Sequence, residues 1–259
     1  MTAQSTQLVA VSDIHIHSPD DQRAQTLLAL IDKLMDQPPV YFVLIGDIFD
    51  ICLGNHKFFQ KRFSEIGKSL ERLASSGTKV FFVEGNHEFR IEKMPWKGIH
   101  FVTQPDIMLP LDDRISIKIA HGDLIYSHNR YKRFRKFIKS PVVTGLLSWF
   151  PGKLLNYLAT GSAQISRAQD EYRDISHEKI LGAANAWLSS SSATFGMFGH
   201  FHVPYAEPRK DGRTGQLLSM KSWDEPNALV FKDNAFYRWN LQNGVDGELD
   251  LAVPLLSNN

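Results

Sequence analysis

Five short stretches of this chain place residues that can bind metal ions directly after an apolar run. The residues concerned are Asp13, His15, Asp47, Asn86, His121, His200 and His202. Carboxylate and amide oxygens and imidazole nitrogens suit divalent ions such as manganese, iron and zinc. Because a pair of such ions activates water and clamps an in-line displacement, the set predicts a metal-dependent hydrolase.

We predict two ions that share the Asp47 carboxylate. One ion is expected to bind Asp13, His15, Asp47 and His202, and the other Asp47, Asn86, His121 and His200. The spacing of Asp13 and His15 favours this arrangement, because alternate residues of an extended strand point to the same side. His87 is expected to stay off the ions, near the leaving-group oxygen, as a general acid or a charge stabiliser.

The elements that position these residues are short strands. The apolar runs are residues 9–11, 41–45, 80–83, 117–120 and 195–198. In the first half of the chain they alternate with helical patterns, near residues 27–34 and 57–74, which is typical of βαβ units in an α/β fold. Residues 107–109 and 115–117 predict a hairpin, residues 176–188 a helix, and residues 217–239 two or three late strands.

A change in composition predicts a helical lid over residues 126–176, inserted between core segments 1–125 and 177–259. Tyr131, Phe134 and Ile138 share a helical face whose surroundings are basic. The basic run, residues 130–139, would either rim the site or form an ordinary solvated helix face. The apolar stretch that follows, residues 142–158, would hold acyl chains, or pack as core or as a dimer contact.

Composition excludes several classes of protein. A chain of 259 residues with a formal charge of +1 has no global field for nucleic acid. The single cysteine, Cys52, cannot form an intrachain disulfide and suits a reducing compartment. Residues 1–7 lack the basic start of a secretory signal, and no apolar run is long enough to span a bilayer. We therefore expect a cytoplasmic protein, with the lid as the part that would contact the inner membrane.

The order of the motifs resembles that of the calcineurin-like metallophosphoesterases. The matching pieces are Asp13-Ile14-His15, Gly46-Asp47, Gly85-Asn86-His87-Glu88, His121-Gly122-Asp123 and Gly199-His200-Phe201-His202. The resemblance covers the chain except the lid. It implies a four-layer α/β/β/α sandwich, hydrolysis of a phosphoric ester or anhydride, and two divalent ions, commonly manganese in bacterial members, with iron or zinc as alternatives.

Within that superfamily the chain looks most like the UDP-2,3-diacylglucosamine hydrolases of lipid A synthesis, which release UMP and a lipid monophosphate. The resemblance rests on residues 46–50, the basic segment after His121-Gly122-Asp123, the helical insertion, and Ser222-Trp223. It implies substrate contacts from Asn86, His87, Tyr131, Arg135, Ser162 and Arg167.

Two departures leave other functions open. The sequence has His87-Glu88 where those enzymes typically have Arg-Asp, and Asp224 where they have histidine. The alternatives are a soluble phosphoesterase acting on nucleotides or phosphoproteins, and a metal-free scaffold.

Overall fold

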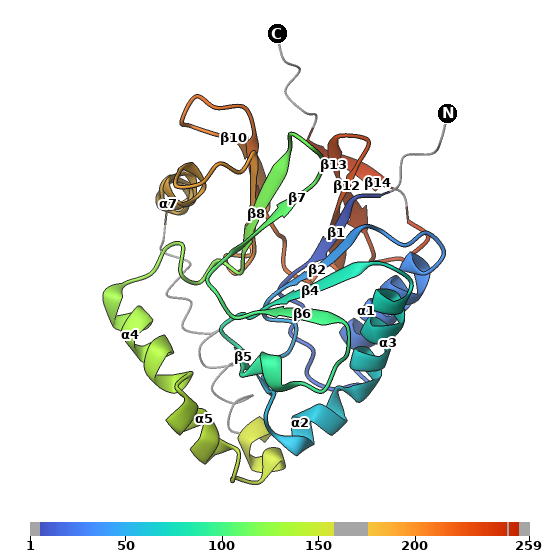
Figure 1. Cartoon of the computed structure of the whole chain (residues 1–259), viewed down its shortest axis with the longest axis vertical. Coiled ribbons are helices and arrows are strands. Elements are labelled where there is room, and N and C mark those ends of the chain that lie inside the picture. The colour runs from blue at the N-terminus through green and yellow to red at the C-terminus, as the bar shows by residue number, and fades with distance from the viewer. Residues whose placement is uncertain (1–5, 158–175, 248, 254–259) are drawn as a thin grey trace.

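The structure, a computed structural model, describes residues 6–157, 176–247 and 249–253, and its strands form two large sheets (Figure 1). The seven-stranded sheet has the order β14 (Leu249–Val253), β13 (Ala235–Asn240), β12 (Asn227–Lys232), β1 (Leu8–Val11), β2 (Tyr41–Ile45), β4 (Lys79–Val83) and β6 (Ile99–Val102). The five-stranded sheet has the order β10 (Tyr205–Pro208), β11 (Gln216–Ser219), β9 (Phe195–Phe198), β8 (Ser116–Ala120) and β7 (Ile107–Pro110). A small ribbon pairs β3 (Cys52–Leu53) with β5 (Glu88–Phe89).

The helices lie on the outer faces of the two sheets or in the lid. They are α1 (Gln22–Leu34), α2 (Lys57–Arg62), α3 (Ser64–Ser75), a 3-10 turn η1 (Ile91–Lys93), α4 (Asn129–Ile138), α5 (Pro141–Leu147) and α7 (His177–Ser189). In Figure 1, α1 and α3 flank one side of the sheets and α7 the other, whereas α4 and α5 lie apart at the lower left.

Strand alternation accounts for the layers. In β2, Val43 and Ile45 pack in the core between the two sheets, while Phe42 and Leu44 pack against α1 and α3. Both faces of this strand are therefore buried, as expected for a parallel strand covered on two sides. On the far side, Leu188 of α7 packs against Phe198 of β9. The result is the predicted four-layer α/β/β/α sandwich.

Three parallel strands of the first sheet and two of the second end at the same edge of the sandwich. Strand β2 runs parallel to β1 and β4, and β8 runs parallel to β9. The loops after these five strands carry all of the predicted metal ligands. Carboxyl ends of parallel strands are the usual position for ligand sites in α/β folds.

Other predicted elements match the structure with one exception. Strands β7 and β8 form the expected hairpin, and Asp21 caps α1 by accepting a hydrogen bond from the Arg23 backbone amide. The helix predicted near residues 57–74 is broken at Phe63, whose φ of −102° and ψ of 18° are not helical. The fully buried Phe63 ring stacks on Phe49, which explains why the chain bends there.

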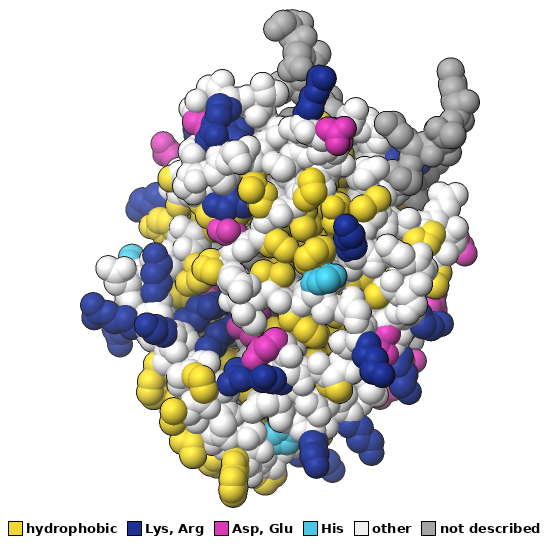
Figure 2. All heavy atoms as spheres, in the orientation of Figure 1, with side chains coloured by type: hydrophobic (Ala, Val, Ile, Leu, Met, Phe, Trp, Pro, Cys, Tyr) yellow, Lys and Arg dark blue, Asp and Glu magenta, His cyan; other side chains and the backbone are white. Residues whose placement is uncertain are grey.

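The described part of the segment predicted to be a lid consists of α4, α5 and a helical turn at residues 152–157. It exposes large apolar side chains, namely Phe134, Phe137, Val142, Leu146, Trp149, Phe150, Leu154 and Tyr157. In Figure 2 hydrophobic side chains line the lower left edge, and Lys and Arg side chains gather beside them. Among the described residues no helix is long and apolar enough to cross a membrane.

Candidate metal centre

The loops at the common strand edge bring six of the seven predicted ligands, together with His87, into three overlapping groups. They are Asp13, His15 and His202; His15, Asp47 and His87; and Asp47, His121 and His200. Within each group, one nitrogen or oxygen per residue lies within 4.8 Å of the others. Because His15 and Asp47 each belong to two groups, the groups form one continuous cluster.

Asp47 belongs to two of the three groups. Its Oδ2 atom is 3.4 Å from His121 Nε2, and the Asn86 side-chain oxygen is 2.9 Å from the same nitrogen. On the other side, a carboxylate oxygen of Asp47 lies within 4.8 Å of a ring nitrogen of His15. Asp47 is thus close to members of both predicted ligand sets.

The backbone at the ligands adopts a conformation that side-chain-bearing residues rarely take. Positive φ angles occur at eight non-glycine residues of the described chain, and five of these are Asp13, His15, Asp47, His200 and His202. A non-glycine residue in this region costs of order 1 kcal/mol or more, and such strain concentrates at functional sites. The loops turn sharply after their strands, and this turn directs the side chains inward.

Two glycines allow the loops to approach so closely. A Cβ atom on Gly85 would lie 2.3 Å from Asp47 Oδ1, and one on Gly199 would lie 2.3 Å from Asp13 Oδ2. Either distance is far inside van der Waals contact. Glycine is therefore required by the packing of the carboxylates.

Charge and burial shift the pKa values of the cluster in opposite directions. Burial acts to raise the pKa of Asp47, but His121 and His87 together hold it well below its ordinary value. Burial acts to lower the pKa of His121, yet Asp47 and Asp13 raise it to about 10. For His15, burial prevails and the pKa falls to about 4. The buried anions thus draw a compensating positive charge into the cluster.

The residues fit divalent ions. Oxygen and imidazole donors converge from five loops, and the carboxylates are the anionic component that such ions require. The buried His15 Nδ1 has no hydrogen-bond partner among the described residues, and its nearest carboxylate oxygen, Asp50 Oδ1, is 3.8 Å away. Asp50 is well placed to orient that imidazole, as partners of metal-bound histidines do.

His87 lies beside the cluster with a defined orientation. Its Nδ1 is 2.7 Å from the Asp50 backbone oxygen, which can only accept, so Nδ1 carries a proton. The opposite ring nitrogen, Nε2, faces Asp47 Oδ2 at 3.8 Å. This geometry permits the predicted role near a leaving group, and it also places His87 within reach of an ion at His15 and Asp47.

Glu88 is a functional candidate that sequence reasoning left without a role. Its buried carboxylate accepts four backbone hydrogen bonds, from Asp47, Ile48, Phe49 and Gly85, at 2.8 to 3.2 Å. Burial, followed by Asp47, raises its pKa to about 7, against the opposing effect of these bonds. Its position after Asn86-His87 was the available signal, but the distant backbone partners appear only in the fold.

Glu88→Gln is expected to weaken manganese binding by about 10-fold, as losses of supporting residues around a metal do. An amide nitrogen cannot accept, so two of the four N–H groups lose their partner. Manganese titration measures the loss of metal affinity, and thermal melting in chelator measures the effect of the two lost hydrogen bonds on stability. Glu92→Gln is the matched control, since Glu92 pairs with Arg90 outside the cluster. Wild-type affinity in Glu88→Gln would contradict the role.

The structure describes two of the four substrate contacts predicted in residues 126–176. The Tyr131 hydroxyl and Arg135 Nε both donate to Asp123 Oδ2, at 3.1 and 2.5 Å. They therefore anchor α4 to the loop that carries His121, and their contact with substrate stays a prediction. Ser162 and Arg167 lie outside the described residues.

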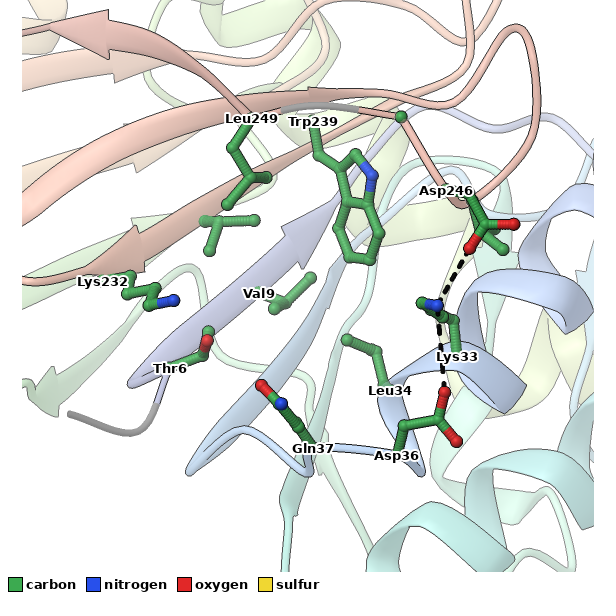
Figure 3. Close-up of a pocket in the computed structure, with 13 residues that line it drawn as sticks. Thr6, Val9, Lys33, Leu34, Asp36, Gln37, Lys232, Trp239, Asp246 and Leu249 are labelled. Atoms are coloured by element: carbon green, nitrogen blue, oxygen red, sulfur yellow. Dashed lines mark hydrogen bonds and ion pairs between the residues drawn. The ribbon is translucent and has the colours of Figure 1, made fainter. Parts of the chain in front are cut away.

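A separate hollow of about 390 Å³ lies between α1 and strands β12 and β13 (Figure 3). Lys33 there pairs with Asp246 at 2.9 Å and Asp36 at 3.9 Å. The hollow shares no lining residue with the metal-ligand cluster. Because Lys33 already pairs with these two carboxylates, its ammonium is not free to bind a phosphate there.

The chain is similar in sequence to known proteins over most of its length. The chain is 25% identical to a UDP-2,3-diacylglucosamine hydrolase of Azotobacter vinelandii, covering 88% of this chain and 95% of that protein. It is 26% identical to the Neisseria meningitidis protein of the same name, over 95% and 96%. A dimetal phosphatase from Danio rerio matches with a TM-score of 0.49 at 11% identity, covering 96% of this chain and 97% of that chain. The calcineurin-like phosphoesterase family model matches residues 6–204, and the chain therefore belongs to that family.

Proposed function

We propose that this chain is a dimetal hydrolase of a lipid-linked nucleotide diphosphate, of which UDP-2,3-diacylglucosamine is the best candidate. The products would be UMP and a lipid monophosphate. The observation that carries the proposal is the convergence of carboxylates and imidazoles on Asp47 beside a lid that exposes apolar side chains. Relatives named for this hydrolase match nearly the whole chain.

The chain's residues have distinct tasks in this proposal. Asp13, His15, Asp47 and His202 would hold one ion, and Asp47, Asn86, His121 and His200 the other. When bound, such ions activate water and stabilise charge on phosphorus; manganese is the first candidate, with iron and zinc as alternatives. In its imidazolium form, with Nδ1–H bonded to the Asp50 carbonyl, His87 would donate a proton to the departing phosphate oxygen through Nε2–H, or stabilise the charge on that oxygen.

The proposal is tested by comparing two substrates, each with and without metal. A UDP-linked diacyl sugar and bis(p-nitrophenyl) phosphate are offered to the same enzyme, with chelator and with added manganese. We expect manganese-dependent release of UMP from the lipid-linked substrate. Turnover confined to the aryl diester would favour the soluble phosphoesterase. The Gly85-Asn86-His87-Glu88 motif is the sequence feature that favours this alternative. No bound metal and no turnover would favour the scaffold.

The lid is the proposed contact with the inner membrane, on its cytoplasmic face. Trp149 and Phe137 are 90% and 67% exposed, and Lys and Arg side chains lie on the adjacent α4. Exposed aromatic groups next to cations suit the interface of an anionic bilayer. The same face would receive a substrate that is itself anchored in the membrane.

Replacing Phe137 and Trp149 together with aspartate is expected to weaken binding to vesicles containing phosphatidylglycerol by at least about 10-fold. Once inserted into the bilayer, the two aromatic side chains contribute several kcal/mol at most to the free energy of membrane binding. The added aspartates also repel an anionic surface. Flotation of the protein with vesicles measures the effect. Met108→Asp is the control, because Met108 is 50% exposed on β7, outside the lid. Equal flotation of all three proteins would refute membrane contact through the lid.

A further inference from the structure

Lys139 joins the lid to the core through a largely buried contact. It follows α4 directly, and its ammonium donates to Glu84 Oε1 at 2.8 Å and to the Gly85 carbonyl oxygen at 2.5 Å. The ammonium also lies 5.4 Å from the centre of the Phe89 ring. The Lys139 and Glu84 side chains are only 11% and 9% exposed. Breaking one partner of such a buried pair is costly, because the other charge stays buried.

The loop that Lys139 contacts is the one that presents Asn86 and His87. The Gly85 carbonyl is bound by Lys139, and the Gly85 N–H donates to Glu88 Oε2 at 3.0 Å. The peptide unit on each side of Gly85 is therefore fixed, by the lid on one side and by the core on the other. The direction of the following residue, Asn86, depends on both.

Apolar packing contributes little to the position of α4. None of its residues, Asn129–Ile138, is buried, and Phe134 and Phe137 are 57% and 67% exposed. Its polar side chains reach Asp123, two residues after His121. The helix is thus attached by polar contacts to two loops that carry candidate ligands.

We propose that Lys139 is a positioning residue that couples docking of α4 to the shape of the Asn86-His87 loop, and so to metal binding. The inference rests on the proposed metal centre. Coupling between two events is reciprocal, so bound metal must stabilise the docked helix as much as the docked helix favours metal. This reciprocity gives a test on the unaltered protein.

Hydrogen exchange of the wild-type protein, with manganese and with chelator, measures the coupling. We expect manganese to slow exchange in residues 129–139 as well as in residues 84–89. In Lys139→Met the slowing of residues 129–139 is lost, and manganese binds about 10-fold more weakly, as after loss of other supporting residues. Lys136→Met is the matched control, because Lys136 is an exposed residue of α4 with no ion pair among the described residues.

The outcomes separate this inference from the proposed function. A wild-type protein that binds no manganese refutes the metal centre itself, and the coupling with it. Bound manganese that leaves exchange in residues 129–139 unchanged refutes the coupling alone. Wild-type manganese affinity in a folded Lys139→Met would also overturn it, since a merely structural lysine would lower the melting temperature without altering affinity. If Lys139→Met does not fold, the wild-type exchange comparison decides.

Discussion

Asp47→Ala is expected to reduce turnover by more than about 100-fold, beyond the loss seen when residues that only support a ligand are removed. The Asp47 carboxylate is the group shared by the candidate ligand sets, and it lies 3.4 Å from His121. Without it neither ion keeps its full coordination, and the pair is no longer held together. Metal analysis of the purified variant should show fewer bound ions than in the wild type.

The fold of Asp47→Ala is expected to survive. The carboxylate accepts one backbone hydrogen bond, from the His87 amide at 2.9 Å, and the surrounding sheets pack without it. Thermal melting in chelator compares the variant with Asp32→Ala, a substitution at a surface residue that pairs with Arg72. Wild-type turnover in a folded Asp47→Ala would refute the bridging role.

The ligand cluster could be predicted because each ligand follows a strand whose apolar run is unmistakable. Parallel strands bring their carboxyl ends to one edge, so residues as distant as Asp13 and His202 meet without any local sequence signal linking them. The left-handed backbone at these residues was not predictable. It arises from close packing between loops, as at Gly199 and Asp13.

Features that depend on tertiary contacts escaped prediction. The helical pattern through residues 57–74 gave no sign of the break at Phe63, which the buried aromatic stack imposes. The bonds from Tyr131 and Arg135 to Asp123 were not predicted either, and the contact of these two residues with substrate stays a prediction. Glu88 carried no sequence signal for its four backbone partners, since three of them lie about forty residues earlier in the chain.

His87→Ala is expected to lower kcat by about 10² to 10⁴-fold, the usual contribution of a general acid. The fixed proton on Nδ1 leaves Nε2 to face the cluster, where a leaving oxygen would lie. The effect should be large for a phosphodiester that releases an alkoxide, which needs a proton to leave, and small for a p-nitrophenyl ester, whose leaving group needs none. Rates on the two kinds of substrate measure this difference.

Metal content decides between the two roles that the geometry of His87 allows. A general acid can be removed without loss of either ion, whereas a ligand within reach of His15 and Asp47 cannot. His17→Ala is the matched control, because His17 lies 3.3 Å from the neighbouring Asp50 and its side chain is 47% exposed. If His87→Ala binds less manganese than His17→Ala and loses rate equally on both substrates, His87 is a ligand, because a missing ion slows every substrate whatever its leaving group.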